Sequence, residues 1–227
     1  MNDRSLDIGR ALTFMFEEED WVRKFLIASA MVFFSWLIVP WFLLQGYVVE
    51  VIRRVGRNQE PELPRWDDWG QYLSDGLVAT VALLFYSLPT VLLACCMALF
   101  AIAMSDPQTG ELGGGAVLVI CCLVFFIILI QIPLYLAYYA GLLRFADRGN
   151  LANFFQFGQL WSYIRNNLGQ YGFAVLVIII ANVIGGFIPV LGQAWSQLAT
   201  GHALGQLLDI SRGGDVLDTE TPIGSEL

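Results

Sequence analysis

The chain has 227 residues, of which 57% are hydrophobic and only 14% are charged, and its net charge is −8. An ordinary soluble domain is about 45 to 50% apolar and about 25% charged, so this composition excludes a typical water-soluble fold. The acidic balance also excludes the basic surface that nucleic-acid binding requires, and we expect the lipid bilayer, not a nucleic acid, to surround or contact the chain.

The apolar residues are gathered in four long blocks that hold no acidic residue and a single basic one, Arg144. These blocks are residues 25–47, 77–104, 116–145 and 171–193. Each exceeds the roughly 20 residues that a helix needs to cross a hydrocarbon core of about 30 Å. Strands of a membrane barrel are about 10 residues long and alternate in polarity, which these blocks do not. The sequence therefore predicts an all-α fold, a polytopic transmembrane bundle of four to five proline-kinked membrane helices with amphipathic surface helices.

Residues 1–24 predict an N-terminal amphipathic segment. Ser5 can cap a helix whose apolar side chains gather on one face, which favours a helix lying on the membrane surface. That face holds Leu6, Ile8, Leu12, Met15 and Phe16. Trp21 is placed to lie at the membrane interface, and Lys24 flanks the first apolar block as an anchor.

The first block predicts one long helix over residues 25–57, kinked at Pro40, because proline lacks an N–H and its ring clashes with the preceding turn. Such a helix would be about 50 Å long, so its last turns would leave the membrane. There Glu50 can pair with Arg53 or Arg54 at helical spacing.

The next stretch, LPRWDDWGQYLSDGL at residues 63–77, predicts an amphipathic surface helix that begins after Pro64. One face would carry Trp66, Trp69, Leu73 and Leu77, and the other would carry Asp67, Asp68 and Asp75. The three aspartates lack the spacing of a calcium loop and no histidine is near them, so we expect no metal site here.

The second half continues with spans that contain Pro89 and Pro133, a second surface segment at residues 153–167, and a fourth span. Residues 194–210 predict a fifth helix inside the bundle, because Gly201 and Gly205 allow close helix approach; a surface helix is the alternative. The resemblance of WGQYL at 69–73 to FGQLW at 157–161 predicts that the 25–210 bundle has two related halves, 25–104 and 115–210. Residues 211–227 predict an acidic flexible tail.

The expected topology contains a conflict. The loop at 105–114 carries no lysine or arginine and should lie outside, which puts the arginines of 53–65 and 144–165 inside. If the first block crosses fully, the N-terminus then lies outside despite its basic residues. The alternative is a re-entrant hairpin around Pro40 with a cytoplasmic N-terminus.

Groups suited to catalysis are scarce. The spans hold almost no ionisable residue, and the single histidine, His202, is six residues from Ser196 and hence on another helix face. We expect no catalytic residue, no enzymatic activity, no cofactor and no metal ligand. The leading hypothesis is a non-enzymatic membrane subunit or scaffold with a membrane-protein partner or a second copy as its partner. The alternative is a small channel or carrier for neutral or apolar solutes.

Several short motifs resemble those of a known family. They are Asp20-Trp21-x-x-Lys24, Gly46-Tyr47 with Arg53-Arg54, Leu63-Pro64-x-Trp66-Asp67-Asp68-Trp69-Gly70, Asp75-Gly76-Leu77 and His202-x-x-Gly205-Gln206-Leu207. With them the chain, from about Phe16 to Leu208, resembles the prokaryotic membrane family called domain of unknown function 4013. The resemblance implies a multi-pass protein in the cytoplasmic membrane of a bacterium or archaeon and no established activity. The motif residues are candidates for a structural or interface role.

Overall fold

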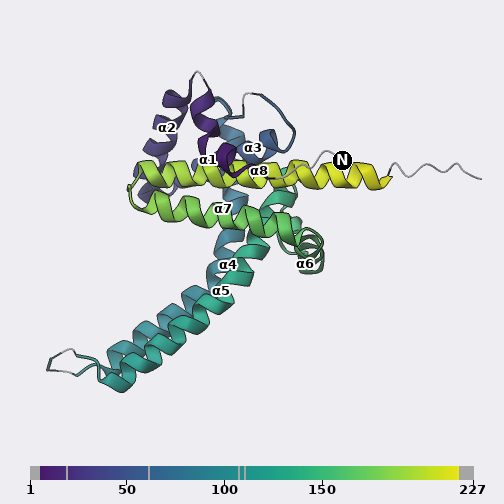
Figure 1. Ribbon diagram of the computed structural model, residues 1–227. Helices are drawn as coiled ribbons and strands as arrows, with labels where there is room; N and C mark the ends of the chain where they lie inside the picture. The colour runs from purple at the N-terminus through teal and green to yellow at the C-terminus, as the bar shows by residue number, and fades with distance from the viewer. Residues whose placement is uncertain (1–5, 19, 61, 107, 110, 220–227) are drawn as a thin grey trace, which may run out of the picture.

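The computed structural model describes residues 6–18, 20–60, 62–106, 108–109 and 111–219, with side chains as far as Arg212. Within these ranges all regular elements are helices, and the one β-bridge joins Ser105 to Leu112 at the end of a helical hairpin. The prediction of an all-α fold is therefore confirmed. Figure 1 shows two long helices that project together from a cluster formed by the other helices.

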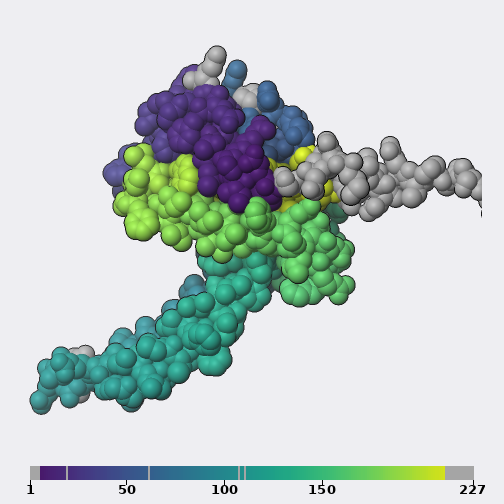
Figure 2. Space-filling view, viewed as in Figure 1, coloured from purple at the N-terminus to yellow at the C-terminus, as the bar shows by residue number. Residues whose placement is uncertain are grey.

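The N-terminal segment forms α1 (Ile8–Thr13) and a 3-10 turn, η1 (Phe14–Glu17). Asp7, not Ser5, caps α1 by accepting a hydrogen bond from the backbone N–H of Arg10; Ser5 lies outside the described residues. That this segment lies on the membrane stays a prediction, but part of its predicted apolar face packs against the protein. Its apolar side chains are buried in the protein because α8 offers them a face to pack on, as Figure 2 shows for the purple segment over the green helices. The buried ones are Leu6, Ala11, Phe14 and Met15.

The first apolar block forms two helices, α2 (Trp21–Phe33) and α3 (Val39–Val55), joined by a 3-10 turn, η2 (Ser35–Leu37). The prediction of one kinked helix over 25–57 is wrong. The chain breaks at Ile38, whose φ of 68° is left-handed, and Pro40 lies in the first turn of α3, where a missing N–H costs nothing. The two helices form a hairpin around this break, and its re-entry into the membrane stays a prediction.

The projecting pair is α4 (Trp69–Met104) and α5 (Gly114–Arg148), about 54 and 52 Å long at 1.5 Å per residue. No residue in the most apolar 18-residue stretch of either helix is buried in the protein. Pro89 and Pro133 lie inside these helices, which continue across them. The predicted separate surface helix at 64–77 does not form, because α4 begins at Trp69 and runs directly into the apolar region.

The second half is completed by η3 (Leu151–Phe154), α6 (Phe157–Asn166), α7 (Leu168–Gly186) and α8 (Leu191–Thr219). The predicted amphipathic helix near 153–167 is present as α6, which buries Leu160 and Ile164 and exposes Phe157 and Trp161. Helix α8 extends to Thr219, into the segment predicted as a tail, and residues 220–227 lie outside the described part of the chain.

Helix α8 lies inside the bundle, which confirms the prediction of a buried fifth helix. It runs parallel to α3, since Gly201 faces Val48 and Val51 and Gly205 faces Val55. The contact is close enough that a Cβ on Gly205 would lie 2.5 Å from the Cβ of Val55. Small residues at the interface allow this approach, as in other membrane helix pairs.

The α2–α3 and α7–α8 pairs are similar hairpins. Helices α3 and α8 each begin directly after a β-branched residue with φ of 68°, Ile38 and Val190. Both turns expose large apolar side chains, with Trp36 73% and Phe187 81% exposed. The two hairpins do not occupy equivalent positions in the predicted halves 25–104 and 115–210, since one begins the first half and the other ends the second. The relation between the halves stays a prediction.

Three helices in the described ranges, α4, α5 and α7, are long and apolar enough to cross a membrane, and the protein is membrane-embedded. The expectation of four to five spans is not confirmed, because no other helix in these ranges is both long enough and apolar enough to be counted as a span. Helices α2 and α3 have only 13 and 17 residues, about 20 and 26 Å, and α3 carries Glu50, Arg53 and Arg54.

Candidate functional site

Motif residues of the linker between α3 and α4 contact both α2 and α3. This contact region, formed first by Lys24, Tyr47, Pro64 and Trp66, is called the joint below. The rings of Tyr47 and Trp66 are stacked, with centroids 4.0 Å apart and an interplanar angle of 4°. The Tyr47 hydroxyl donates to the carbonyl oxygen of Pro64 over 2.9 Å, and Trp66 Nε1 donates to the Lys24 carbonyl over 3.2 Å. Burial, and next the neighbouring Tyr72, raise the pKa of Tyr47 well above its usual value, so this hydroxyl remains a neutral donor.

Lys24 extends the same joint. Its buried ammonium pairs with the Glu18 carboxylate and donates to the carbonyl oxygen of Leu63 over 2.6 Å. The other Glu18 oxygen accepts from the Leu63 N–H over 2.7 Å. The sequence predicted Lys24 as a membrane anchor, but its ammonium is buried in the protein and binds Glu18 and Leu63. Trp21 is not part of the joint and instead packs edge-on against Phe16 at 4.9 Å.

Two motif glycines allow α3 and α4 to touch backbone to backbone. A Cβ on Gly46 would lie 1.8 Å from the carbonyl oxygen of Tyr72, and one on Gly76 would lie 1.7 Å from that of Phe42. No real side chain fits at such distances. Gly70 differs, because a Cβ there would meet no heavy atom within 4 Å.

Arg53 connects α3, α4 and α5. Its guanidinium contacts Glu50 at 2.7 Å and Asp75 at 3.1 Å, and its Nε donates to the Ala146 carbonyl over 3.1 Å. Burial alone would lower the pKa of Arg53, but hydrogen bonds and charges from Glu50 and Asp75 outweigh it and raise that pKa. Arg54 pairs with the other Glu50 oxygen at 3.1 Å. The spacing predicted the Glu50 pairs but not Asp75 or Ala146.

The remaining linker acids are not brought into this joint. Asp67 and Asp68 are exposed, and Asp68 caps α4 by accepting from the Gln71 N–H over 3.3 Å. Trp69 is exposed, with its ring 5.6 Å from that of Trp66. The predicted face of Trp66, Trp69, Leu73 and Leu77 therefore exists only for the last three, which lie on the exposed side of α4.

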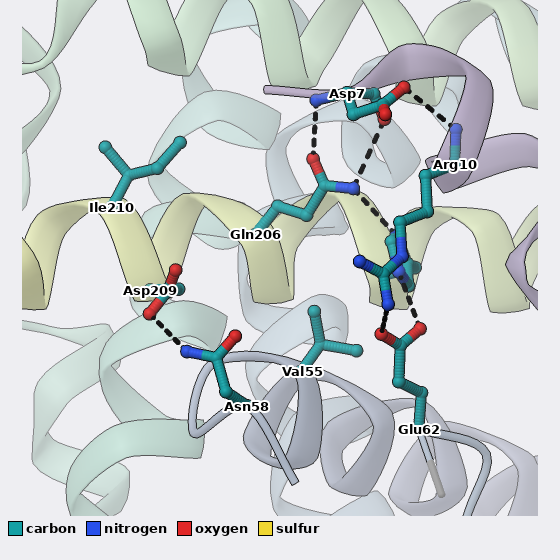
Figure 3. A pocket seen from close by; sticks show the side chains of 9 residues that line it. Asp7, Arg10, Val55, Asn58, Glu62, Gln206, Asp209 and Ile210 are labelled. Atoms are coloured by element: carbon teal, nitrogen blue, oxygen red, sulfur yellow. Dashed lines mark hydrogen bonds and ion pairs between the residues drawn. The ribbon is translucent and has the colours of Figure 1, made fainter. Parts of the chain in front are cut away.

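A polar pocket of about 410 Å³ lies between α1, the linker and α8 (Figure 3). Glu62 connects two sides of this pocket, since one carboxylate oxygen contacts Arg10 at 2.5 Å and the other contacts His202 Nε2 at 3.0 Å. Only 1% of His202 is exposed, and its ring stacks on Phe14 with centroids 4.2 Å apart. Burial opposes ionisation of Glu62, but the hydrogen bond to His202 and the charge of Arg10 outweigh it and lower the pKa of Glu62.

Gln206 attaches the N-terminal segment to the same pocket. Its carbonyl oxygen accepts from the Asp7 N–H over 2.9 Å, and its Nε2 lies 3.2 Å from both the Asp7 carbonyl oxygen and His202 Nδ1 (Figure 3). The motif His202-x-x-Gly205-Gln206 could have indicated one helix face, because 202 and 206 are four residues apart. No such spacing indicated the other two contacts. Glu62 and His202 are 140 residues apart in the sequence, and Arg10 and Glu62 are 52 residues apart.

These contacts fasten helices to one another. Ser196 donates to the Gln193 carbonyl over 3.0 Å in its own helix and is not paired with His202. In the described part of the chain, no three His, Cys, Asp or Glu side chains are grouped as a metal site. The arrangement around Glu62 and the arrangement around Arg53 each use partly buried charged groups to hold three or more segments together.

A second, less polar cavity of about 600 Å³ lies between α3, α4, α5, α7 and α8. None of the side chains that line it is charged. Gln45, which is only 6% exposed, lines it together with Asn182 and Gln197, so the few polar groups of the lining are uncharged carboxamides and hydroxyls.

The profile of one family, described as "Protein of unknown function (DUF4013)", matches residues 30–192, which is most of the chain. The chain belongs to this family. The matched range of this DUF4013 protein contains the linker motif, both close-contact glycines and Arg53. It excludes Lys24 and the His202 motif, so the resemblance over 16–208 is shown only for the shorter range. No match was found among the curated proteins or the solved structures.

The Glu62 contacts give a testable pH dependence. Glu62→Gln should lower the stability of the detergent-solubilised protein at pH 7 by about 1 kcal/mol, because charge-assisted hydrogen bonds to Arg10 and His202 are lost at a partly exposed site. Because the folded-state pKa of Glu62 is lowered, this contribution is present above its ordinary pKa of about 4.3 and disappears as pH falls below it. Unfolding of both proteins between pH 7 and pH 3 measures the difference. A gap that stays constant over this range would refute the role given to Glu62.

Proposed function

We propose that this DUF4013 protein is a non-enzymatic subunit or scaffold in the cytoplasmic membrane of a prokaryote, where it associates with another membrane protein or with a second copy of itself. One observation carries the proposal. No residue in the most apolar 18-residue stretch of α4 or of α5 is buried in the protein, while the charged groups of Lys24, Arg53 and Glu62 are all engaged in holding helices together. A surface of this kind supports assembly in the membrane more directly than it supports chemistry.

The contacts also support one topology. If α4 and α5 cross the bilayer, residues 105–113 lie on one side and the arginine-bearing segments 53–65 and 144–165 lie on the other, which the positive-inside rule assigns to the cytoplasm. Arg10 and Asp7 contact Glu62 and Gln206, so the N-terminal segment lies on the cytoplasmic side too. The α2–α3 hairpin would then enter and leave the membrane from that side, which agrees with the alternative of a re-entrant hairpin and a cytoplasmic N-terminus.

This proposal is tested by identifying the proteins that remain bound to this protein after gentle extraction from the membrane. We expect a stoichiometric membrane-protein partner or a self-associated species from native membranes, identified by cross-linking and mass spectrometry. Leu99→Ala combined with Phe125→Ala, two exposed side chains of the hairpin, should weaken the association without preventing insertion. Gln59→Ala in the exposed linker is the matched control and should leave it intact. Extraction of a single monomeric species under all mild conditions would count against the proposal.

The cavity beside Gln45 favours a second candidate function, a small channel or carrier for neutral or apolar solutes. Its uncharged lining disfavours ions, and the carboxamides of Gln45 and Gln197 could hydrogen-bond an uncharged polar group. Flux of a broad panel of neutral solutes into liposomes that contain the protein tests this candidate. Flux no greater than through lipid alone removes it.

A further inference from the structure

Three arginines line a separate hollow of about 490 Å³ between the end of α5, α6, the start of α7, and α8. These are Arg144, Arg148 and Arg212, and the only carboxylate in the lining is Asp147. Asp147 pairs with Arg212 and lies 3.8 Å from Arg148, which leaves the hollow with an excess of two positive charges. Such an excess favours an anionic ligand.

Arg144, which belongs to the lining of this hollow, has unused hydrogen-bonding capacity. Its Nη2 donates to the side-chain oxygen of Gln159, but its Nη1 is buried and has no hydrogen-bond partner among the described residues. Arg144 also forms no ion pair with a described carboxylate. A buried guanidinium nitrogen without an acceptor is costly, and a phosphate oxygen would satisfy it.

Neutral donors surround the same space. Asn166 and Gln170 belong to its lining, as does Asn167, whose side chain already donates to the Tyr163 carbonyl; Asn167 directly precedes α7, a helix of 19 residues, and Gln170 lies in its first turn. The free N–H groups and the positive end of the dipole at a helix start attract phosphate. Arginines and a helix N-terminus therefore meet at one place.

The hollow also lies where the chain leaves the apolar region. Residues 112–143 carry no charge, and Arg144 is the first charged residue of α5 after them. On α6, which contributes to the same lining, Trp161 is 60% exposed, as expected for a tryptophan among lipid headgroups. We propose that this hollow binds the phosphate group of an anionic glycerophospholipid on the cytoplasmic side of the membrane.

Native mass spectrometry of the full chain in detergent tests the site with phosphatidylglycerol as the probe and phosphatidylcholine, whose choline cancels the phosphate charge, as the comparison. We expect one phosphatidylglycerol to be retained with higher affinity than phosphatidylcholine. Arg144→Gln should weaken its binding about tenfold, the effect of losing one charge-assisted hydrogen bond. Arg148→Gln, at a largely exposed side chain that tolerates replacement, should also weaken it, so the test survives if the first variant does not fold. Arg65→Gln, at an exposed linker position, should bind like the wild type.

A further arm adds inorganic phosphate at 100 times the lipid concentration. If it leaves the lipid bound, the headgroup and chains together are the ligand, as proposed. If it displaces the lipid and binds in its place with equal affinity, the hollow is a site for soluble phosphate and the lipid assignment is overturned. Equal phosphatidylglycerol binding by Arg144→Gln, Arg148→Gln and Arg65→Gln would overturn the site itself. None of these outcomes depends on whether a protein partner or a transported solute exists.

Discussion

Gly46→Ala is expected to destabilise the folded protein by at least about 3 kcal/mol, or to prevent folding. The new methyl carbon would lie 1.8 Å from the carbonyl oxygen of Tyr72, which belongs to the backbone of α4 and cannot rotate away. Helices α3 and α4 would have to separate, which would also disturb the stacking of Tyr47 on Trp66. Unfolding of the detergent-solubilised protein with increasing sodium dodecyl sulfate, followed by circular dichroism, measures the effect.

The matched control is Gly172→Ala, at an exposed position in the second turn of α7. A Cβ there meets no heavy atom within 4 Å, and alanine favours a helix by about 1 kcal/mol over glycine. This variant should be as stable as the wild type or slightly more so. If Gly46→Ala and Gly172→Ala unfold at the same detergent concentration, α3 and α4 do not touch as described.

Arg53→Met should cost about 3 kcal/mol, because it leaves the carboxylates of Glu50 and Asp75 largely buried and without their main partner. Methionine keeps much of the side-chain volume, so the loss reports charge pairing more than packing. The same unfolding experiment measures it. Arg65→Met, at an exposed position, is the control and should change stability by less than about 0.5 kcal/mol.

A double variant separates charge from packing at this position. In Arg53→Met, Glu50 keeps its contact with Arg54, so adding Asp75→Asn removes the carboxylate that has lost its ion pair and should restore part of the lost stability. A double variant less stable than Arg53→Met alone would show that Asp75 is not a partner of Arg53.

The sequence predicted those features that depend on the length and polarity of whole segments. Apolar runs of about 30 residues without a charge can only be helices in lipid, which is why the all-α fold and the α4–α5 hairpin were predictable. The buried position of α8 followed from Gly201 and Gly205, because small side chains at that spacing allow a close helix contact.

Helix ends and long-range pairs were not predictable in the same way. Pro40 can kink a helix or begin one, and the deciding feature, the left-handed backbone at Ile38, is not encoded by any turn residue. Trp66 matches the spacing of Trp69 and Leu73, but periodicity does not say where a helix starts, and Trp66 stacks on Tyr47 instead. Pairing of Glu62 with His202 depends on the tertiary fold, and no local pattern indicates it.

The most direct test of the account is the side of the membrane on which three exposed positions lie. Single cysteines are placed at Glu17, Gln59 and Thr109 in a protein whose native cysteines are alanine; the replaced residues are Cys95, Cys96, Cys121 and Cys122. An impermeant thiol reagent added to intact cells should label only the cysteine at 109, and those at 17 and 59 should react only after the membrane is opened. Labelling of 59 and 109 from the same side would contradict the crossing hairpin, and labelling of 17 with 109 would contradict the cytoplasmic N-terminal segment.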